Sequence, residues 1–142
     1  MLETLKTLAA QITARRAAGG DTDYAAELAD LRAMAQAGPQ PGAGFKWGAA
    51  GTIAHLGDCR TPTETKKAVA AAMKAAGFAY VNSAKMMGGS ETLHDFMHPE
   101  VPGIKYQLHM RPFTRWKEKM ASFSFEVKTT RLTYESLTRA KR

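Results

Sequence analysis

The chain has 142 residues and a formal net charge of +7, from 20 Lys and Arg against 13 Asp and Glu, with a single cysteine. A chain of this length fits one compact domain and excludes two independent cores. The lone cysteine excludes an internal disulfide and would leave zinc to histidine and carboxylate ligands, so we expect no metal site and no cofactor.

The amino-terminal segment, residues 1–37, predicts a helical hairpin. Its first helix has apolar residues at three- and four-residue steps, and the second, capped by Asp21 or Thr22, is ended by Gly38 and Pro39. The apolar stripes consist of Leu2, Leu5, Leu8, Ala9 and Ile12 in the first helix and of Tyr24, Leu28, Leu31 and Ala35 in the second. Neither helix buries its stripe alone, so we expect the pair to dock on the rest of the chain or on another copy of itself as a homo-oligomer.

A Pro- and Gly-rich segment, residues 38–44, predicts a linker because it cannot continue a helix. The remainder, residues 45–142, is expected to form an α+β domain with a basic carboxyl-terminal third. Directly after the linker we expect a loop with one short strand. His55 and Cys59 lie in this loop, where no second cysteine completes a metal site.

The clearest local signal is TPTE at residues 61–64. Thr61 can cap a helix, Pro62 suits its first position, and Glu64 can reach back to the cap. The pattern predicts a helix over residues 62–76, closed by Gly77. Its buried face is predicted to consist of Val69, Ala72, Met73 and Ala76.

After Gly77 the apolar period changes from helical to two, which is typical of strands. The predicted strands cover residues 78–82, 92–97, 104–110 and 122–128. Their short connections favour antiparallel pairing. We therefore expect an α+β fold in which one helix covers a four-stranded antiparallel meander, preceded by the helical hairpin, with a short helix or a basic tail at the carboxyl end.

The pairing register of the second and third strands decides where three histidines point. If facing residue numbers sum to 202, Phe96 enters the core and His94 and His98 share its face. If they sum to 201, Leu93, Asp95 and Met97 enter the core instead, and His94 shares the open face with His109. Each register half-buries one polar group, at a cost of about 1 to 3 kcal/mol. We favour the sum of 201 because it leaves the titratable rings in solvent.

In that register His94 and His109 form a candidate catalytic pair on adjacent strands, beside Lys105. Two imidazoles and a lysine could act as acid, base and phosphate clamp in ribonucleotide cleavage without a metal. His94 and His98 are about 13 Å apart along one strand, too far to share a metal ion. The alternative is that these are ordinary histidines of a β-hairpin.

A Lys-rich helix ending in KAAGF leads to a strand, then to GGS and HDFMHPE. This stretch, from about residue 64 to residue 110, resembles the small HicA-type toxins, mRNA interferases with Gly-Ser-His and His-Pro motifs. The resemblance implies a helix, three strands and a helix, and ribonuclease activity with a catalytic histidine. In that family the histidine directly follows Gly-Ser, whereas here Glu91 follows Ser90 and the nearest candidate is His94. The helical hairpin and a strand-like segment in place of the final helix also depart from the family.

The basic excess lies entirely in the last third of the chain. Residues 101–142 hold 10 basic and 3 acidic residues, against 10 and 10 in residues 1–100. Within it, residues 111–120 interleave cations with Phe113 and Trp116, so that the aromatic rings can stack on unpaired bases while the cations neutralise phosphates. The competing interpretation makes both rings core anchors of a long hairpin connection.

We therefore predict a small basic protein that binds RNA or DNA. The predicted phosphate contacts are Lys105, Arg111, Arg115, Lys117, Lys119, Lys128 and Arg131, with Trp116 as a stacking residue. One alternative is a phage- or plasmid-type accessory or inhibitor protein that binds an acidic protein surface, and another is a HicA-like, metal-independent ribonuclease. Because no signal peptide or membrane-spanning run is evident, we expect a cytoplasmic protein without a membrane partner.

Overall fold

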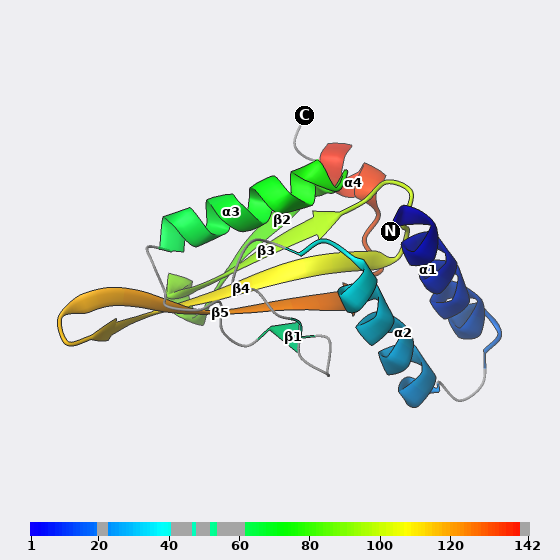
Figure 1. The fold of residues 1–142 in the computed structure, drawn as a ribbon, viewed down its shortest axis with the longest axis horizontal. Coiled ribbons are helices and arrows are strands. Elements are labelled where there is room, and N and C mark those ends of the chain that lie inside the picture. The colour runs from blue at the N-terminus through cyan, green and yellow to red at the C-terminus, as the bar shows by residue number, and fades with distance from the viewer. Residues whose placement is uncertain (20–22, 41–46, 48–51, 54–61, 140–142) are drawn as a thin grey trace.

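The computed structural model describes residues 1–19, 23–40, 47, 52–53 and 62–139. The helices and strands are labelled in Figure 1 in their order along the chain. They are α1 (Leu2–Ala17), α2 (Tyr24–Ala37), β1 (Thr52–Ile53), α3 (Pro62–Ala75), β2 (Ala79–Met86), the 3-10 turn η1 (Met87–Gly89), β3 (Glu91–Met97), β4 (Ile104–Arg115), β5 (Glu118–Thr129) and α4 (Tyr134–Arg139). The linker expected at residues 38–44, the cap Thr61, and the pair His55 and Cys59 lie wholly or largely outside the described residues.

The sheet is an antiparallel meander of β2, β3, β4 and β5, each strand pairing with the next. The two-residue strand β1 adds to the edge beside β5, which gives the order β1-β5-β4-β3-β2. The predicted α+β class, with a four-stranded antiparallel meander after a helical hairpin, is confirmed, and β1 extends it by one strand.

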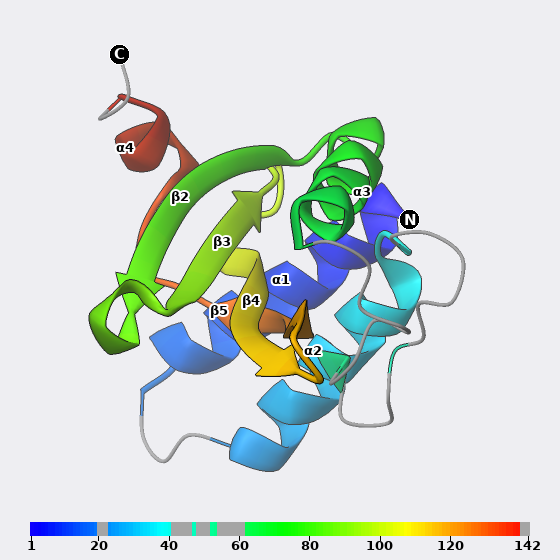
Figure 2. The ribbon, with the colours of Figure 1, turned by 90° about the vertical axis from the view of Figure 1, so that its left-hand side faces the viewer.

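Three helices share one hydrophobic core with the sheet. The cluster combines Leu5, Ala9 and Ile12 of α1, Met34 and Ala35 of α2, and Val69 and Met73 of α3 with alternate residues of β4 and β5. The helical pair therefore docks on the sheet of its own chain. The short helix α4 lies on the side of β2 that faces away from α3 (Figure 2).

Helix α3 follows its prediction closely. It begins at Pro62 and buries Val69 and Met73, as the periodicity indicated. Gly77 ends it with φ of +88°, and a Cβ there would lie 2.8 Å from His98 Nε2. Both the backbone angle and the close ring therefore require glycine at this position.

Only the carboxyl-terminal half of the stripe predicted for helix α2 meets the core, where Ala35 is buried and Leu31 packs against the cluster. Asp23, rather than Asp21 or Thr22, is the N-cap, and its carboxylate accepts a hydrogen bond from Ala26 N at 3.0 Å. Tyr24 and Leu28 are exposed. Met34 is buried instead, and its carbonyl accepts a 2.8 Å hydrogen bond from the phenol of Tyr106 in β4.

The predicted β3–β4 register is wrong: the facing numbers sum to 202, with Phe96 opposite Tyr106 and His94 opposite Leu108. Phe96 is buried in the helix-covered core, and His94 shares its face. The register gives both His94 and Asp95 polar partners. His94 Nδ1 and the Tyr80 hydroxyl are hydrogen-bonded, and Asp95 on the other face accepts a 2.8 Å hydrogen bond from Gln107 and lies 3.4 Å from Lys105 Nζ. The desolvation cost expected for a buried Asp95 is thus offset without moving it into the helix-covered core.

Candidate nucleic-acid interface

Strands β4 and β5 continue well past the rest of the sheet as a two-stranded arm, residues 111–122. The last pair between β3 and β4 is Thr92 with Met110, and from Arg111 opposite Ser122 outward the described pairing is between β4 and β5 alone. In Figure 1 the arm extends beyond every other element at one end of the molecule. The prediction of a hairpin connection over residues 111–120 is therefore wrong, because the strands run on through most of it.

A two-residue turn closes the arm. Trp116 and Lys117 occupy its two central positions with φ of +52° and +67°. Positive φ at both positions is the signature of a type I′ turn, which strongly prefers Asn-Gly because L side chains disfavour this conformation. The tip of the arm therefore holds two bulky residues against the local backbone preference.

Aromatic surface is exposed along the arm. The side chain of Trp116 is 88% exposed and that of Phe113 is 42% exposed, and Lys117 beside Trp116 is also exposed. The interpretation of both rings as core anchors is thus wrong. The apolar face of the sheet continues into the arm at Pro112 and Ala121, which lie opposite each other, and of these two residues Ala121 is buried.

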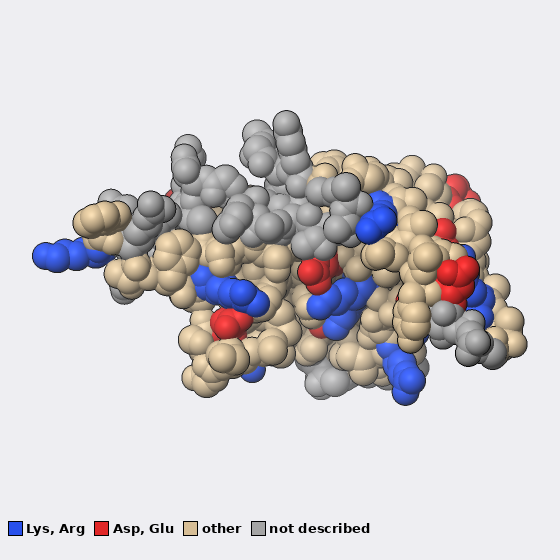
Figure 3. Space-filling model, turned by 90° about the horizontal axis from the view of Figure 1, so that it is seen from below, with Lys and Arg blue, Asp and Glu red and all other residues tan. Residues whose placement is uncertain are grey.

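Most of the predicted phosphate contacts on the sheet itself have acidic partners. Lys105 Nζ lies 3.4 Å from Asp95, Lys128 Nζ lies 3.2 Å from Glu126, and at the base of the arm Arg111 Nε lies 3.0 Å from Glu91. Figure 3 shows Lys and Arg in separate groups, several of them beside Asp or Glu, and a basic group at the extreme end of the molecule.

The predicted set of cations is consequently split between two ends of the ribbon. Lys128 is 11 residues from Lys117 along the chain, about 36 Å in an extended strand. Arg131 is exposed and follows β5 at the end far from the arm. Arg115 lies in β4 and Lys119 in β5, on either side of the turn that closes the arm.

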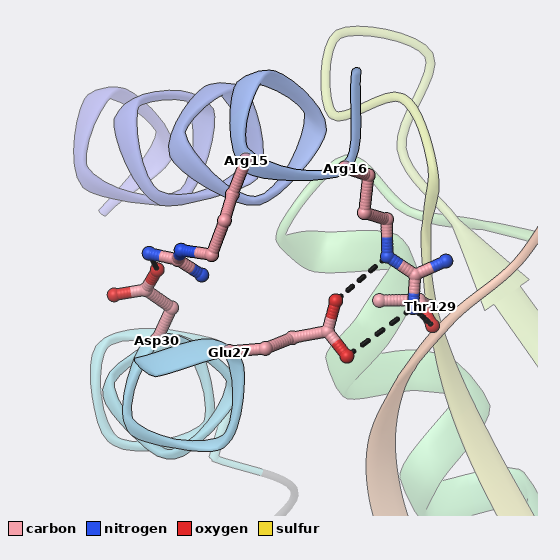
Figure 4. Close-up of polar contacts among 5 residues, drawn as sticks. All are labelled: Arg15, Arg16, Glu27, Asp30 and Thr129. Carbon is pink, nitrogen blue, oxygen red and sulfur yellow. Dashed lines mark hydrogen bonds and ion pairs between the residues drawn. The ribbon is translucent and has the colours of Figure 1, made fainter. Parts of the chain in front are cut away.

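At the end of the ribbon far from the arm, two arginines form ion pairs that connect elements of the fold. Arg15 of α1 binds Asp30 of α2 at 2.7 Å, and Arg16 binds Glu27 at 2.6 Å. Arg16 also donates to Thr129 Oγ1 at 2.9 Å, which joins both helices to the end of β5 (Figure 4). The hydrogen bond from Arg16 lowers the pKa of Glu27 below its usual value. Sequence patterns did not reveal this cluster, because its partners lie on different elements with no fixed spacing.

His94 lies in a polar cluster at the margin of the core. Its Nδ1 and the Tyr80 hydroxyl are 3.0 Å apart in a hydrogen bond, and Lys66 Nζ lies 5.9 Å from the centre of the Tyr80 ring. The side chain of His94 is only 5% exposed. Burial lowers its pKa below the ordinary value, and the positive charge of Lys66 lowers it further.

The structure does not bring His94 and His109 together. Because His94 faces Leu108 and His109 faces Leu93, the two rings point to opposite faces of the sheet. His109 instead lies 2.7 Å from Glu91, the same carboxylate that Arg111 contacts. The pairing of two imidazoles with Lys105, on which the ribonuclease hypothesis depends, is therefore not formed.

The described ranges of the chain contain neither a cluster of metal ligands nor a membrane-spanning helix. Nowhere in them do three or more His, Cys, Asp or Glu side chains gather in a way that would hold a metal ion. Among the helices of the same ranges, none combines the length and apolar character needed to cross a bilayer.

Comparison with known proteins yields no relative. No protein-family model matches the chain, and neither does any curated protein or solved structure. The resemblance to HicA-type toxins therefore rests on its short motifs alone, and the site must be argued from the chemistry of its own residues.

Proposed function

We propose that the protein binds nucleic acid through the arm. The observation that carries the proposal is the exposed Trp116 beside Lys117 at the end of a projecting ribbon, in a turn whose backbone disfavours both residues. Residues held in a sparsely populated backbone conformation often have a functional reason to be there. The surrounding charge fits, since residues 111–120 hold four basic residues and one acidic residue.

The proposal narrows the predicted contact set to the arm. Arg111, Arg115, Lys117 and Lys119 supply phosphate contacts, and Trp116 supplies a flat apolar face. Lys105 and Lys128 are left out because they lie on the sheet, away from the arm, where they pair with Asp95 and Glu126. Arg131 is left out because it lies at the other end of the ribbon.

A variant with a shortened arm tests the proposal. Phe113 pairs with Met120, so residues 114–119 can be replaced by Asn-Gly, which closes a two-residue turn on an existing strand pair. Fluorescence anisotropy with labelled RNA and DNA, single- and double-stranded, should show binding by the parent chain and its loss in this variant. Circular dichroism and a thermal melt should show that the fold is retained.

The shortened arm also lowers the net charge by two, and this needs a matched control. Arg32→Gln with Lys74→Gln removes two exposed cations from α2 and α3 and leaves the arm intact. The control should bind like the parent, and the logarithm of its affinity should fall linearly with the logarithm of salt concentration, as counterion release requires. Equal loss in the control and the shortened variant would show that net charge, not the arm, is responsible.

The alternative partner is an acidic protein surface, which the same cations would recognise, as in an accessory or inhibitor protein of phage or plasmid type. Pull-down from a host lysate before and after nuclease treatment separates the two partners. Capture that disappears with nuclease supports the proposal, whereas capture of a protein that survives nuclease and requires the arm replaces it. Ribonuclease activity is not proposed, because His94 and His109 lie on opposite faces.

A further inference from the structure

We infer that the arm recognises unpaired nucleotides, with a base stacked on the indole of Trp116 and the adjoining phosphate held by Lys117. This inference rests on the proposed function and names its substrate class. It excludes, as the preferred ligand, a regular duplex whose bases are already stacked.

The geometry of the tip favours stacking of Trp116 on a base over insertion of the arm along a groove of a duplex. Trp116 is the most exposed of the large apolar residues that the structure describes, and it occupies the turn rather than a strand. A ring at the turn meets a ligand end-on, so that one face can be covered by a single splayed base. Every base offers such a face, which makes the contact tolerant of sequence.

The charges favour the same substrate class. Duplex binding without base contacts depends on phosphate contacts, and proteins that bind with a strong salt dependence make about 6 to 10 of them. The arm offers four basic residues, and one of these, Arg111, already shares the carboxylate of Glu91 with His109. Few cations next to an exposed aromatic ring suit a flexible single strand, where stacking supplies affinity that phosphates do not.

The two tryptophans make the stacking directly measurable. Trp47 packs against Tyr106 and Phe125, with ring centroids 6.3 and 5.2 Å apart, whereas Trp116 is exposed. Titration of the full chain with a single-stranded oligonucleotide should quench the fluorescence of Trp116. The Trp116→Phe variant, which retains only Trp47 as a tryptophan, should still bind and should lose the quenching.

Three oligonucleotide probes and two further variants separate stacking from other contacts. We expect the single strand and a hairpin with an unpaired loop to bind more tightly than a blunt duplex of the same length. Trp116→Ala should weaken single-strand binding about 5- to 150-fold, as expected for the loss of one stacked base. Trp116→Leu keeps an apolar wedge but removes the flat face, and it should weaken binding almost as much.

The outcomes distinguish this inference from the proposed function. Binding that requires the arm but is equally tight for duplex and single strand, or is retained in Trp116→Leu, overturns the stacking assignment and leaves nucleic-acid binding standing. An absence of binding to every probe overturns both. Capture of an acidic protein with no quenching by any oligonucleotide assigns the arm to a protein partner and likewise overturns both.

Discussion

The two ends of the β4–β5 ribbon use the same kinds of residue in opposite ways. Where it lies within the sheet, aromatic side chains such as Tyr106 and Phe125 are fully buried. In the arm, which begins at Arg111, the aromatic side chains of Phe113 and Trp116 are exposed instead. Near the end of β5, Arg16 is held by Glu27, whereas Lys117 at the tip is exposed.

This contrast shows that composition alone does not identify a binding surface. The basic excess in the last third of the chain includes Lys105 and Lys128, both of which have acidic partners on the sheet. What distinguishes the arm is that Phe113, Trp116 and Lys117 are exposed on it. Variants at both ends of the ribbon test this contrast, from the largest expected effect on stability to the smallest.

The largest difference is expected between two phenylalanines of the ribbon. Phe125→Ala removes a ring buried between Trp47 and Tyr106 and should lower the free energy of unfolding by about 3 to 5 kcal/mol. Phe113→Ala on the arm should lower the free energy of unfolding by less than about 1.5 kcal/mol, because Phe113 is 42% exposed. Urea denaturation of both variants provides the measurement, and equal losses would mean that the arm is as much part of the core as the sheet.

Glu27→Gln tests the polar cluster that joins α1, α2 and β5. It should cost about 1 to 3 kcal/mol at pH 7, because the variant leaves Arg16 without its charged partner. Since the folded chain holds the pKa of Glu27 below its ordinary value of 4.5, the stabilisation is present above that pH and is lost as pH falls through the lowered pKa. Glu3→Gln, at an exposed pair with Lys6, is the control and should have little effect.

Some features of the fold could be predicted from sequence patterns, and others could not. Helix α3 and the meander were predictable because apolar spacing and the TPTE signal act locally. The β3–β4 register was not, because it depends on Asp95 meeting Gln107 and Lys105 across two strands. The length of the arm was missed because Trp116 and Lys117 carry none of the Asn or Gly residues that mark a two-residue turn.

A smaller effect is expected from His94 at the margin of the core. Because burial lowers its pKa below 6.5, the folded chain disfavours protonation, and stability should decline as pH falls below about 6.5. His94→Gln should reduce the dependence of the urea midpoint on pH between 7.5 and 5.5, whatever its effect at pH 7.5. An unchanged pH dependence would show that His94 does not contribute to it.

The most direct test of the account places the preferred turn sequence at the tip. Trp116→Asn with Lys117→Gly should raise the free energy of unfolding by about 1 kcal/mol, because Asn-Gly accepts positive φ at both positions. The same variant should lose oligonucleotide binding, while Lys74→Gln, with the same loss of charge, should keep it. Affinity and unfolding free energy measured on one preparation give the answer. Greater stability with lost binding is the predicted result, and undiminished binding would contradict the assignment of the tip as the interface.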